Sequence, residues 1–185
     1  MTPTIPPGWA ADVLRFWFED CTPQQWFKRD DALDATLRQR FLPVHASVSA
    51  LPVEECLADA QTALAATIVL DQFSRNMFRG TLAAFAMDAR ALAIAEGAIA
   101  RGFDAPLPEN RRQFLYLPFE HAENAAVQAR SVALFAPLGP ESLRWAEAHK
   151  AIIDRFGRFP HRNAILGRAS TPEEIEFLRG PGSSF

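Results

Sequence analysis

Cysteine is scarce in this sequence, which contains only Cys21 and Cys56. The two lie far apart and form no C-x-x-C motif, so the sequence predicts neither a disulfide framework nor a cysteine-based metal site. We expect both thiols to stay reduced and to pack as small apolar groups. A chain of 185 residues can bury enough surface to fold without such links.

Long apolar runs are lacking as well. The longest, Ala63–Leu70, contains Thr67 and is far too short to span a bilayer. The opening residues MTPTIPPGWAAD have neither the basic nor the apolar segment of a secretory signal. A net charge of −3 gives no overall field that attracts nucleic acid. We therefore expect a cytoplasmic protein that binds neither membranes nor nucleic acid.

Well-known catalytic motifs are also missing. The sequence has no Gly-rich phosphate loop, no H-E-x-x-H pair and no serine in a nucleophile elbow. Glu120 and His121 are adjacent and not three residues apart, so the di-iron Glu-x-x-His pattern is absent. We expect no cofactor and no metal ion, and a metal site assembled from scattered His and Glu residues is a minor alternative.

What the sequence does have is helical periodicity along nearly its whole length, with no convincing alternation of period two. Short links between the helices predict antiparallel helix pairs. We expect one all-α domain over residues 1–185, with frayed ends at about 1–8 and 180–185. Pro43 is expected to end a helix and Pro118 to kink or split another. The expected helices lie at about 9–18, 25–27, 31–42, 54–78, 81–101, 108–135, 141–156 and from 172 onward.

The helix expected at 54–78 carries polar residues where a core helix is apolar. It is apolar on all sides from Ala63 onward, which predicts a central position in the fold. Asp71 precedes Arg75 by one turn, in the favourable orientation for an ion pair, and Asn76 and Arg79 follow. Because isolated buried charges are costly, this group either binds something specific or forms an ion-pair network that fixes the helices.

Two further polar groups come later in the chain. Glu120 and His121 directly follow the Pro118 break, where they either line a small cavity or bond the freed backbone. His149 shares a helix face with apolar residues and is expected to point inward. The segment 155–163 then gathers cationic and amide side chains that suit an anion; the alternative is a loop pinned by its phenylalanines. The residues concerned are Arg158, His161, Arg162 and Asn163.

Three functions follow as hypotheses. The first is binding of an anionic small molecule or peptide group, as yet unidentified, in an inter-helix groove. The second is a hydrolase or lyase acting on a phosphorylated or carboxylated metabolite, with Glu120, His149 and His161 as candidate catalytic residues. The third is a protein-interaction scaffold whose polar motifs are structural. The candidate ligand-binding residues are Asp71, Arg75, Asn76, Arg79, Glu120, His121, Arg158, His161, Arg162 and Asn163.

Three long motifs occur in order: LDQFSRNMFRG, FLYLPFEHAEN and HKAIIDRFGRFPHRNAILGR followed by STPEE. From about Val13 to about Leu178 the sequence resembles the bacterial family described as domain of unknown function 924. The resemblance implies an all-α fold of antiparallel helix pairs in a compact, tetratricopeptide-like right-handed superhelical bundle. It implies no established reaction. Ser74 stands where the family pattern has Pro, but the Asp, Arg, His and Asn positions of the motifs are present.

Overall fold

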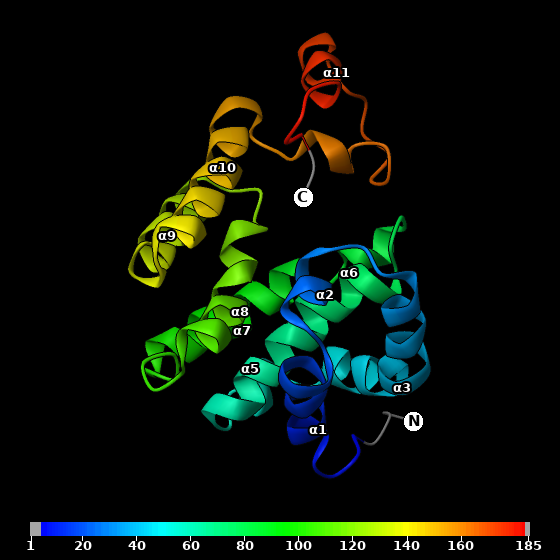
Figure 1. Cartoon of the computed structure of the whole chain (residues 1–185), viewed down its shortest axis with the longest axis vertical. Helices are drawn as coiled ribbons and strands as arrows, with labels where there is room; N and C mark the ends of the chain where they lie inside the picture. Colours follow the sequence, from blue (N-terminus) through cyan, green and yellow to red (C-terminus); the bar gives the residue numbers. More distant parts are fainter. Residues whose placement is uncertain (1–4, 184–185) are drawn as a thin grey trace. The chain divides into compact units, whose positions relative to one another are not determined.

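Helices form the secondary structure of the computed structural model, which describes residues 5–183 and has no strand among them (Figure 1). The all-α prediction is therefore confirmed. The chain divides into two compact units. Unit 1 comprises the residues up to Arg79 together with Ala83–Pro118, and unit 2 comprises Gly80–Leu82 together with the residues from Phe119 onward. The single domain expected over 1–185 stays a prediction, and the fraying expected at both ends falls partly outside the described residues.

Unit 1 contains eight α-helical segments interrupted by short π and 3-10 turns, the last of them ending in unit 2. In chain order they are α1 (Trp9–Arg15), the π turn η1 (Phe16–Asp20), α2 (Pro23–Phe27), α3 (Asp31–Ala50), α4 (Val53–Cys56), α5 (Ala60–Ile68), the π turn η2 (Val69–Phe73), α6 (Ser74–Met77), the 3-10 turn η3 (Leu82–Ala84), α7 (Asp88–Ala100) and α8 (Glu109–Glu120).

Side chains that satisfy free backbone donors set several helix starts in unit 1. Asp30 Oδ1 accepts hydrogen bonds from the backbone N–H groups of Ala32 and Leu33, both at 3.0 Å, and begins α3. Asp59 does the same for α5, a cap that the sequence analysis missed. The short helix expected at 25–27 is confirmed as α2, which begins at Pro23, and the Thr22 backbone N–H donates to Gln25 Oε1 at 2.9 Å in front of it.

The prediction that Pro43 ends the third helix is wrong, because α3 continues through it to Ala50. A proline inside a helix costs about 3 kcal/mol. The buried stripe of the helix, however, runs on from Phe41 to Val44 and Val48. Each fully buried side chain of this size stabilises the fold by about 1.5–3 kcal/mol, so packing outweighs the lost backbone bond.

The helix expected at 54–78 is central but not continuous. α4 ends at Cys56, α5 begins after Asp59, and the π turn η2 joins α5 to α6. Every residue from Ala63 to Ser74 is buried, as the apolar sequence predicts. The helix expected to start at Thr81 is also wrong, since η3 comes first and α7 begins only at Asp88. Asp88 lies in the first turn of α7, where a carboxylate favours the positive end of the helix dipole.

Aromatic rings form much of the interior of unit 1 and join its two π turns. Trp17 of η1 lies edge-on to Phe73 of η2, with ring centroids 5.5 Å apart. Trp17 also lies edge-on to Phe114 of α8 at 5.7 Å, and Phe41 of α3 packs 5.1 Å from Phe73. Edge-to-face pairs of this kind add stability beyond the burial of their area.

Unit 2 is built on a helical hairpin. Its elements are α9 (Ala125–Phe135), the 3-10 turn η4 (Ala136–Leu138), α10 (Pro140–Phe156), the 3-10 turn η5 (Pro160–Arg162) and α11 (Pro172–Leu178). The helix end expected at about 156 and the helix start expected at about 172 are confirmed. Gly157 ends α10 with a φ of 70°, and the Thr171 hydroxyl accepts from the Glu174 backbone N–H at 3.2 Å to begin α11.

The break expected at Pro118 lies a few residues later in the structure. Pro118 is inside α8, which ends at Glu120, and the side chain of Asn124 then begins α9 by accepting from the backbone N–H groups of Ala126 and Val127. The proline removes only its own N–H bond, so the preceding turns of the helix keep theirs. The new helix starts where a side-chain cap is available.

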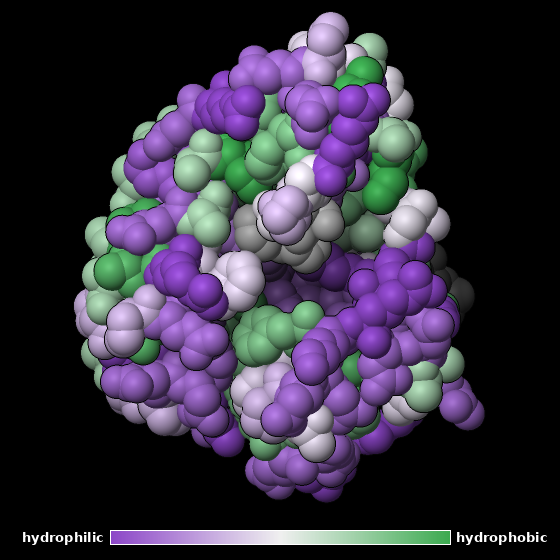
Figure 2. Space-filling model, turned by 45° about the horizontal axis from the view of Figure 1, so that its top comes forward, coloured by the Kyte–Doolittle hydropathy of each residue, from purple (hydrophilic) through white to green (hydrophobic). Residues whose placement is uncertain are grey.

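The surface is mostly polar on the face shown in Figure 2, where apolar residues form smaller patches between hydrophilic ones. Within residues 5–183, no helix combines the length and the apolar character that a crossing of the bilayer requires.

Candidate functional site

The ion pair predicted between Asp71 and Arg75 is confirmed. Arg75 Nη1 lies 3.0 Å from Asp71 Oδ1, and the Asp71 side chain is fully buried in η2. Arg75 also binds both carboxylate oxygens of Asp88, at 2.9 and 3.0 Å. Burial lowers the pKa of Arg75, but Asp71 and Asp88 outweigh it and hold that pKa above its usual value. This group fastens the start of α7 to η2.

A second ion pair in unit 1 contains a residue that the sequence analysis missed. Asp34 of α3 accepts from Asn76 Nδ2 at 2.8 Å and from Arg79 Nε and Nη2 at 2.8 and 3.0 Å. Asp34 lies seven residues, or about two helical turns, before the buried Phe41. This spacing places both residues on the same face of the helix and could have indicated that Asp34 faces the interior. Asp71, Arg75, Asn76 and Arg79 thus all bind partners inside unit 1, and their role as ligand-binding residues stays a prediction.

In unit 2, the backbone at the end of α8 is bonded by a side chain from α9. Gln128 is fully buried, and its Nε2 lies 2.6 Å from the Glu120 carbonyl oxygen, 2.9 Å from that of Ala122 and 3.3 Å from that of Phe119. Carbonyls at a helix end lack partners within the helix, and Gln128 supplies donors to them. The carbonyls at the break are therefore bonded by Gln128, a residue outside the two sequence alternatives, and the roles expected of Glu120 and His121 there stay predictions.

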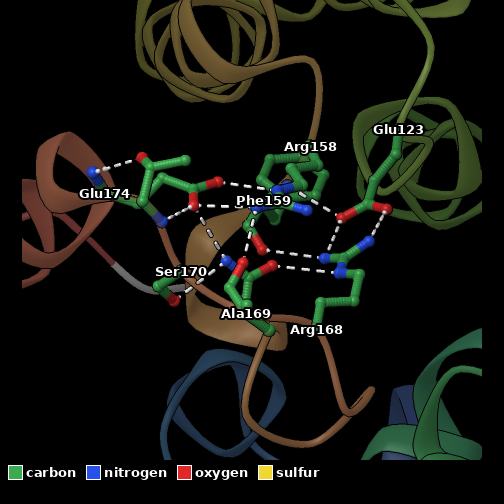
Figure 3. A network of polar contacts seen from close by, with 9 residues as sticks. Glu123, Arg158, Phe159, Arg168, Ala169, Ser170 and Glu174 are labelled. Carbon is green, nitrogen blue, oxygen red and sulfur yellow. Dashed lines mark hydrogen bonds and ion pairs between the residues drawn. The ribbon is translucent and has the colours of Figure 1, made fainter.

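The loop after α10 is held by two carboxylates from outside it (Figure 3). Glu123 lies between α8 and α9 and accepts from both terminal nitrogens of Arg168, at 2.6 and 2.9 Å. Its Oε1 also accepts from the Phe159 backbone N–H at 2.8 Å. Burial raises the pKa of Glu123, but Arg168 and the Phe159 N–H outweigh it and hold that pKa below its usual value. Neither Glu123 nor Arg168 was a predicted site residue.

The second carboxylate is that of Glu174 on α11. Arg158 Nε and Nη2 donate to its two oxygens at 2.7 and 2.8 Å, and Asn163 Nδ2 lies 3.3 Å from Oε2. Asn163 also accepts from Arg168 Nε at 3.0 Å, which joins this pair to that of Glu123 (Figure 3). The Arg158 guanidinium lowers the pKa of Glu174 to about 2. Arg158 and Asn163, both predicted to bind a ligand, therefore take part in a network that fixes the loop.

Phe159 is the centre of a different group in the same loop, which we call the histidine–arginine cluster. The Phe159 ring is fully buried, and the centroids of the His149 and His161 rings lie 5.8 and 5.7 Å from it. The Arg162 guanidinium lies over the same ring at 4.6 Å, and the His121 ring is 6.1 Å from that of His149. The cluster consists of Phe159, the three side chains of His149, His161 and Arg162 against its ring, and His121 against His149.

His149 is the most deeply buried imidazole of the histidine–arginine cluster. Its Nδ1 lies 2.8 Å from the Trp145 carbonyl oxygen, and because a carbonyl only accepts, Nδ1 carries the proton. The neutral ring then has its lone pair on Nε2, at the end of the ring remote from the helix backbone. Burial is the main cause that lowers the pKa of His149 to about 3; His121, Arg162 and His161 contribute to the decrease, and the bond to Trp145 opposes it.

An acid lies at the edge of this cluster. Glu120 Oε1 is 3.9 Å from His149 Nδ1, and both side chains are buried. The structure thus brings together five of the predicted residues: Glu120, His121, His149, His161 and Arg162. It places Arg158 and Asn163 in the neighbouring loop network. Within residues 5–183, no three His, Cys, Asp or Glu side chains are arranged to hold a metal ion.

Comparison with known proteins identifies the family. A family model described as "Bacterial protein of unknown function (DUF924)" matches residues 13–182, and the chain belongs to this family. A solved structure of a protein of unknown function from Agrobacterium tumefaciens is similar to it, with 45% identity and a TM-score of 0.88. The match covers 92% of this chain and 97% of that one. Comparison with curated proteins gives no match.

Proposed function

We propose that this member of the family binds a small anionic group, such as a phosphoryl, sulfate or carboxylate group, at the histidine–arginine cluster. The observation that carries the proposal is the gathering of two imidazoles and a guanidinium around the Phe159 ring, with the imidazole of His121 against that of His149. Imidazolium and guanidinium groups donate charge-assisted hydrogen bonds to anionic oxygens.

The charges around the cluster favour it as the anion site over the other arginines of the sequence motifs. Glu123 and Glu174 lie near the cluster, but Arg168 and Arg158 bind both oxygens of each. Besides burial, which is the main cause, His121, Arg162 and His161 also lower the pKa of His149. A buried site with positive potential attracts an anion more strongly than a solvated one does.

The loop that carries His161 and Arg162 is held in place before any ligand arrives. Two forked ion pairs fix it, one to Glu123 and one to Glu174, and the Phe159 backbone N–H is bonded as well. A preformed site loses less conformational entropy on binding, so the same contacts give a higher affinity.

The test is thermal unfolding in sodium sulfate and in sodium acetate, each at low millimolar concentration, against sodium chloride at equal ionic strength. Sulfate stabilises most proteins slightly without binding a site, so variants are needed. We expect sulfate to raise the Tm of the parent and of the control variant Arg144→Gln, which removes an exposed charge from α10. Arg162→Gln and His161→Gln should lose that increase. An equal response from all four proteins would overturn the proposal, and the acetate arm separates a carboxylate site from one for tetrahedral anions.

An enzyme is the second candidate, and the contact between Glu120 and His149 favours it. The Glu120 carboxyl lies 3.9 Å from His149 Nδ1, which is longer than a hydrogen bond, and a buried carboxyl beside an imidazole is a combination that acid–base catalysis uses. The reaction would be hydrolysis or elimination on a phosphorylated or carboxylated metabolite. Turnover of p-nitrophenyl phosphate or of an activated carboxylic ester, abolished by Glu120→Gln and retained in Glu109→Gln, is the supporting result.

The finer features of the fold and location are proposals of the same kind. The hairpin of α9 and α10 supports a tetratricopeptide-like right-handed superhelix, since such folds are stacked helix pairs. The buried, unpaired thiols of Cys21 and Cys56 support a cytoplasmic location. The ion pairs of the loop network support the scaffold hypothesis, because they join the loop to α11 and to the segment between α8 and α9.

A further inference from the structure

A cavity of about 280 Å³, partly open to solvent, lies in unit 1 between α1 and α3. At about 30 Å³ for each molecule of liquid water, this space suits a compound of roughly ten non-hydrogen atoms. Apolar side chains and charged ones share the lining, a combination that is typical of sites for small molecules. Its described lining residues are Pro6, Trp9, Asp12, Arg15, Arg40, Phe41 and Val44.

Arg40 presents a guanidinium to this cavity with one face against aromatic rings. The guanidinium carbon lies 4.7 Å from the centroid of the Phe16 ring and 5.2 Å from that of Phe41. Its one ion-pair partner within residues 5–183 is Asp20, and Nη1 lies 3.8 Å from Asp20 Oδ2, which is longer than a hydrogen bond. The N–H groups in the plane of the guanidinium are therefore available to the two oxygens of a carboxylate.

The other charges of the lining leave an excess of one positive charge. Arg15 Nη2 lies 3.2 Å from Asp12 Oδ1, so these two residues neutralise each other. Asp20 is outside the lining, and its pair with Arg40 joins two side chains that are 43% and 49% exposed. Such exposed pairs contribute little, so a carboxylate in the cavity can bind Arg40 without a large loss.

We propose that this cavity binds a small monocarboxylate with a compact apolar body, such as an aromatic or branched-chain acid. The carboxylate binds Arg40, and the apolar body packs against Trp9, Phe41 and Val44. A single excess positive charge favours a monoanion over a dianion. The site is in unit 1 and does not depend on the anion site proposed at the histidine–arginine cluster of unit 2.

Sodium benzoate is the probe, and the indole N–H signal of Trp9 in ¹H–¹⁵N NMR spectra at constant ionic strength is the measurement. Trp9→Phe assigns that signal. We expect benzoate to shift it saturably, with a dissociation constant on the order of 1 mM for so small a ligand. Benzamide keeps the ring without the charge, and acetate keeps the charge without the ring. Each should bind about tenfold more weakly, because each lacks one of the two contacts.

The variants test the assignment to Arg40. Arg40→Gln should weaken benzoate binding about tenfold, and Arg40→Lys should lose less, because it keeps the charge but not the planar fork. Arg29→Gln is the matched control, since Arg29 is exposed, pairs with Asp31 and lines no part of the cavity. It should bind benzoate as the parent does.

Three outcomes would overturn the proposal. They are a Trp9 signal that stays unmoved well above the expected dissociation constant, equal binding of benzoate and benzamide, and equal affinities of the parent and Arg40→Gln. None of them bears on the response of Arg162→Gln to sulfate, which tests the proposed function separately. Either site can therefore fail without the other.

Discussion

Arg168 binds both carboxylate oxygens of Glu123, with Nη1 2.6 Å from Oε2 and Nη2 2.9 Å from Oε1. The same Glu123 accepts from the Phe159 backbone N–H, and Arg168 also donates to the Phe159 carbonyl oxygen at 3.2 Å. One ion pair thus fixes both sides of the backbone at the residue around which the histidine–arginine cluster is arranged.

Removing the charge of Glu123 is expected to weaken the folded state. Glu123→Gln should lower the free energy of unfolding by about 2 kcal/mol, because charge-assisted bonds to partly buried groups are among the stronger ones. Arg168→Met should cost a similar amount. The double variant should cost less than the sum of the two, since no charge is then left without a partner. Urea unfolding of the four proteins measures this, and strict additivity would contradict the pairing.

Much of the local structure was predictable because its causes are local. Thr22 and Thr171 lie directly before prolines at helix starts, and Gly157 has the left-handed conformation that ends α10. The predicted pair of Asp71 and Arg75 follows from a spacing of one helical turn. In each of these cases neighbours in sequence are also neighbours in space.

The parts that could not be predicted depend on residues distant in sequence. Asp34 binds Arg79, and Glu123 binds Arg168, each across 45 residues. No local spacing indicates such a partner. Pro43 was misread for a related reason, since the packing of α3 in the interior of unit 1 outweighs the local cost of a proline.

A substitution of Gln128 tests how much the bonds to the carbonyl oxygens at the end of α8 stabilise the fold. Gln128→Leu keeps the approximate size of the side chain but removes the donors to the carbonyls of Phe119, Glu120 and Ala122, of which the first two belong to buried residues. We expect a loss of about 2 kcal/mol in the free energy of unfolding. Gln113→Leu removes a single bond, to the Asn110 carbonyl at 3.2 Å, and should cost much less. Chemical denaturation compares the two, and equal losses would contradict a special role for Gln128.

Two ion pairs between the end of α10 and α11 form a matched comparison. Arg158 binds Glu174, whose side chain is 2% exposed, whereas Arg155 binds Glu173, whose side chain is 63% exposed. Exposed pairs contribute little to stability, while loss of a partner from a buried carboxylate is costly. Arg158→Met should therefore lower the Tm clearly more than Arg155→Met. The reverse order in differential scanning calorimetry would show that the loop network does not stabilise unit 2.

The same ion pair should also fix the loop that carries the cluster. Because Arg158 bonds Glu174 and the Ala169 carbonyl oxygen, its loss frees the segment between η5 and α11. Amide hydrogen exchange of residues 159–171 should be faster in Arg158→Met and unchanged in Arg155→Met. If the anion site depends on this preformed loop, sulfate affinity should fall in the first variant only.

The pH dependence of stability follows from His149. Its pKa is about 3 in the folded chain, lowered mainly by burial, against an ordinary value of 6.5. Between these values the unfolded chain binds a proton that the folded chain does not. The free energy of unfolding should therefore decrease as pH falls from about 6.5 toward 3, by up to about 1.4 kcal/mol per pH unit, and should not depend on this residue above that range. Below pH 4.5, protonation of Glu174 acts in the same direction.

Urea unfolding between pH 7 and pH 5 in chloride measures this slope, and His149→Asn should have a smaller one. The pKa of His45 is also lowered by burial, but His45 is present in both proteins, so their difference isolates His149. An unchanged slope in the variant would show that His149 is not held neutral in the folded chain.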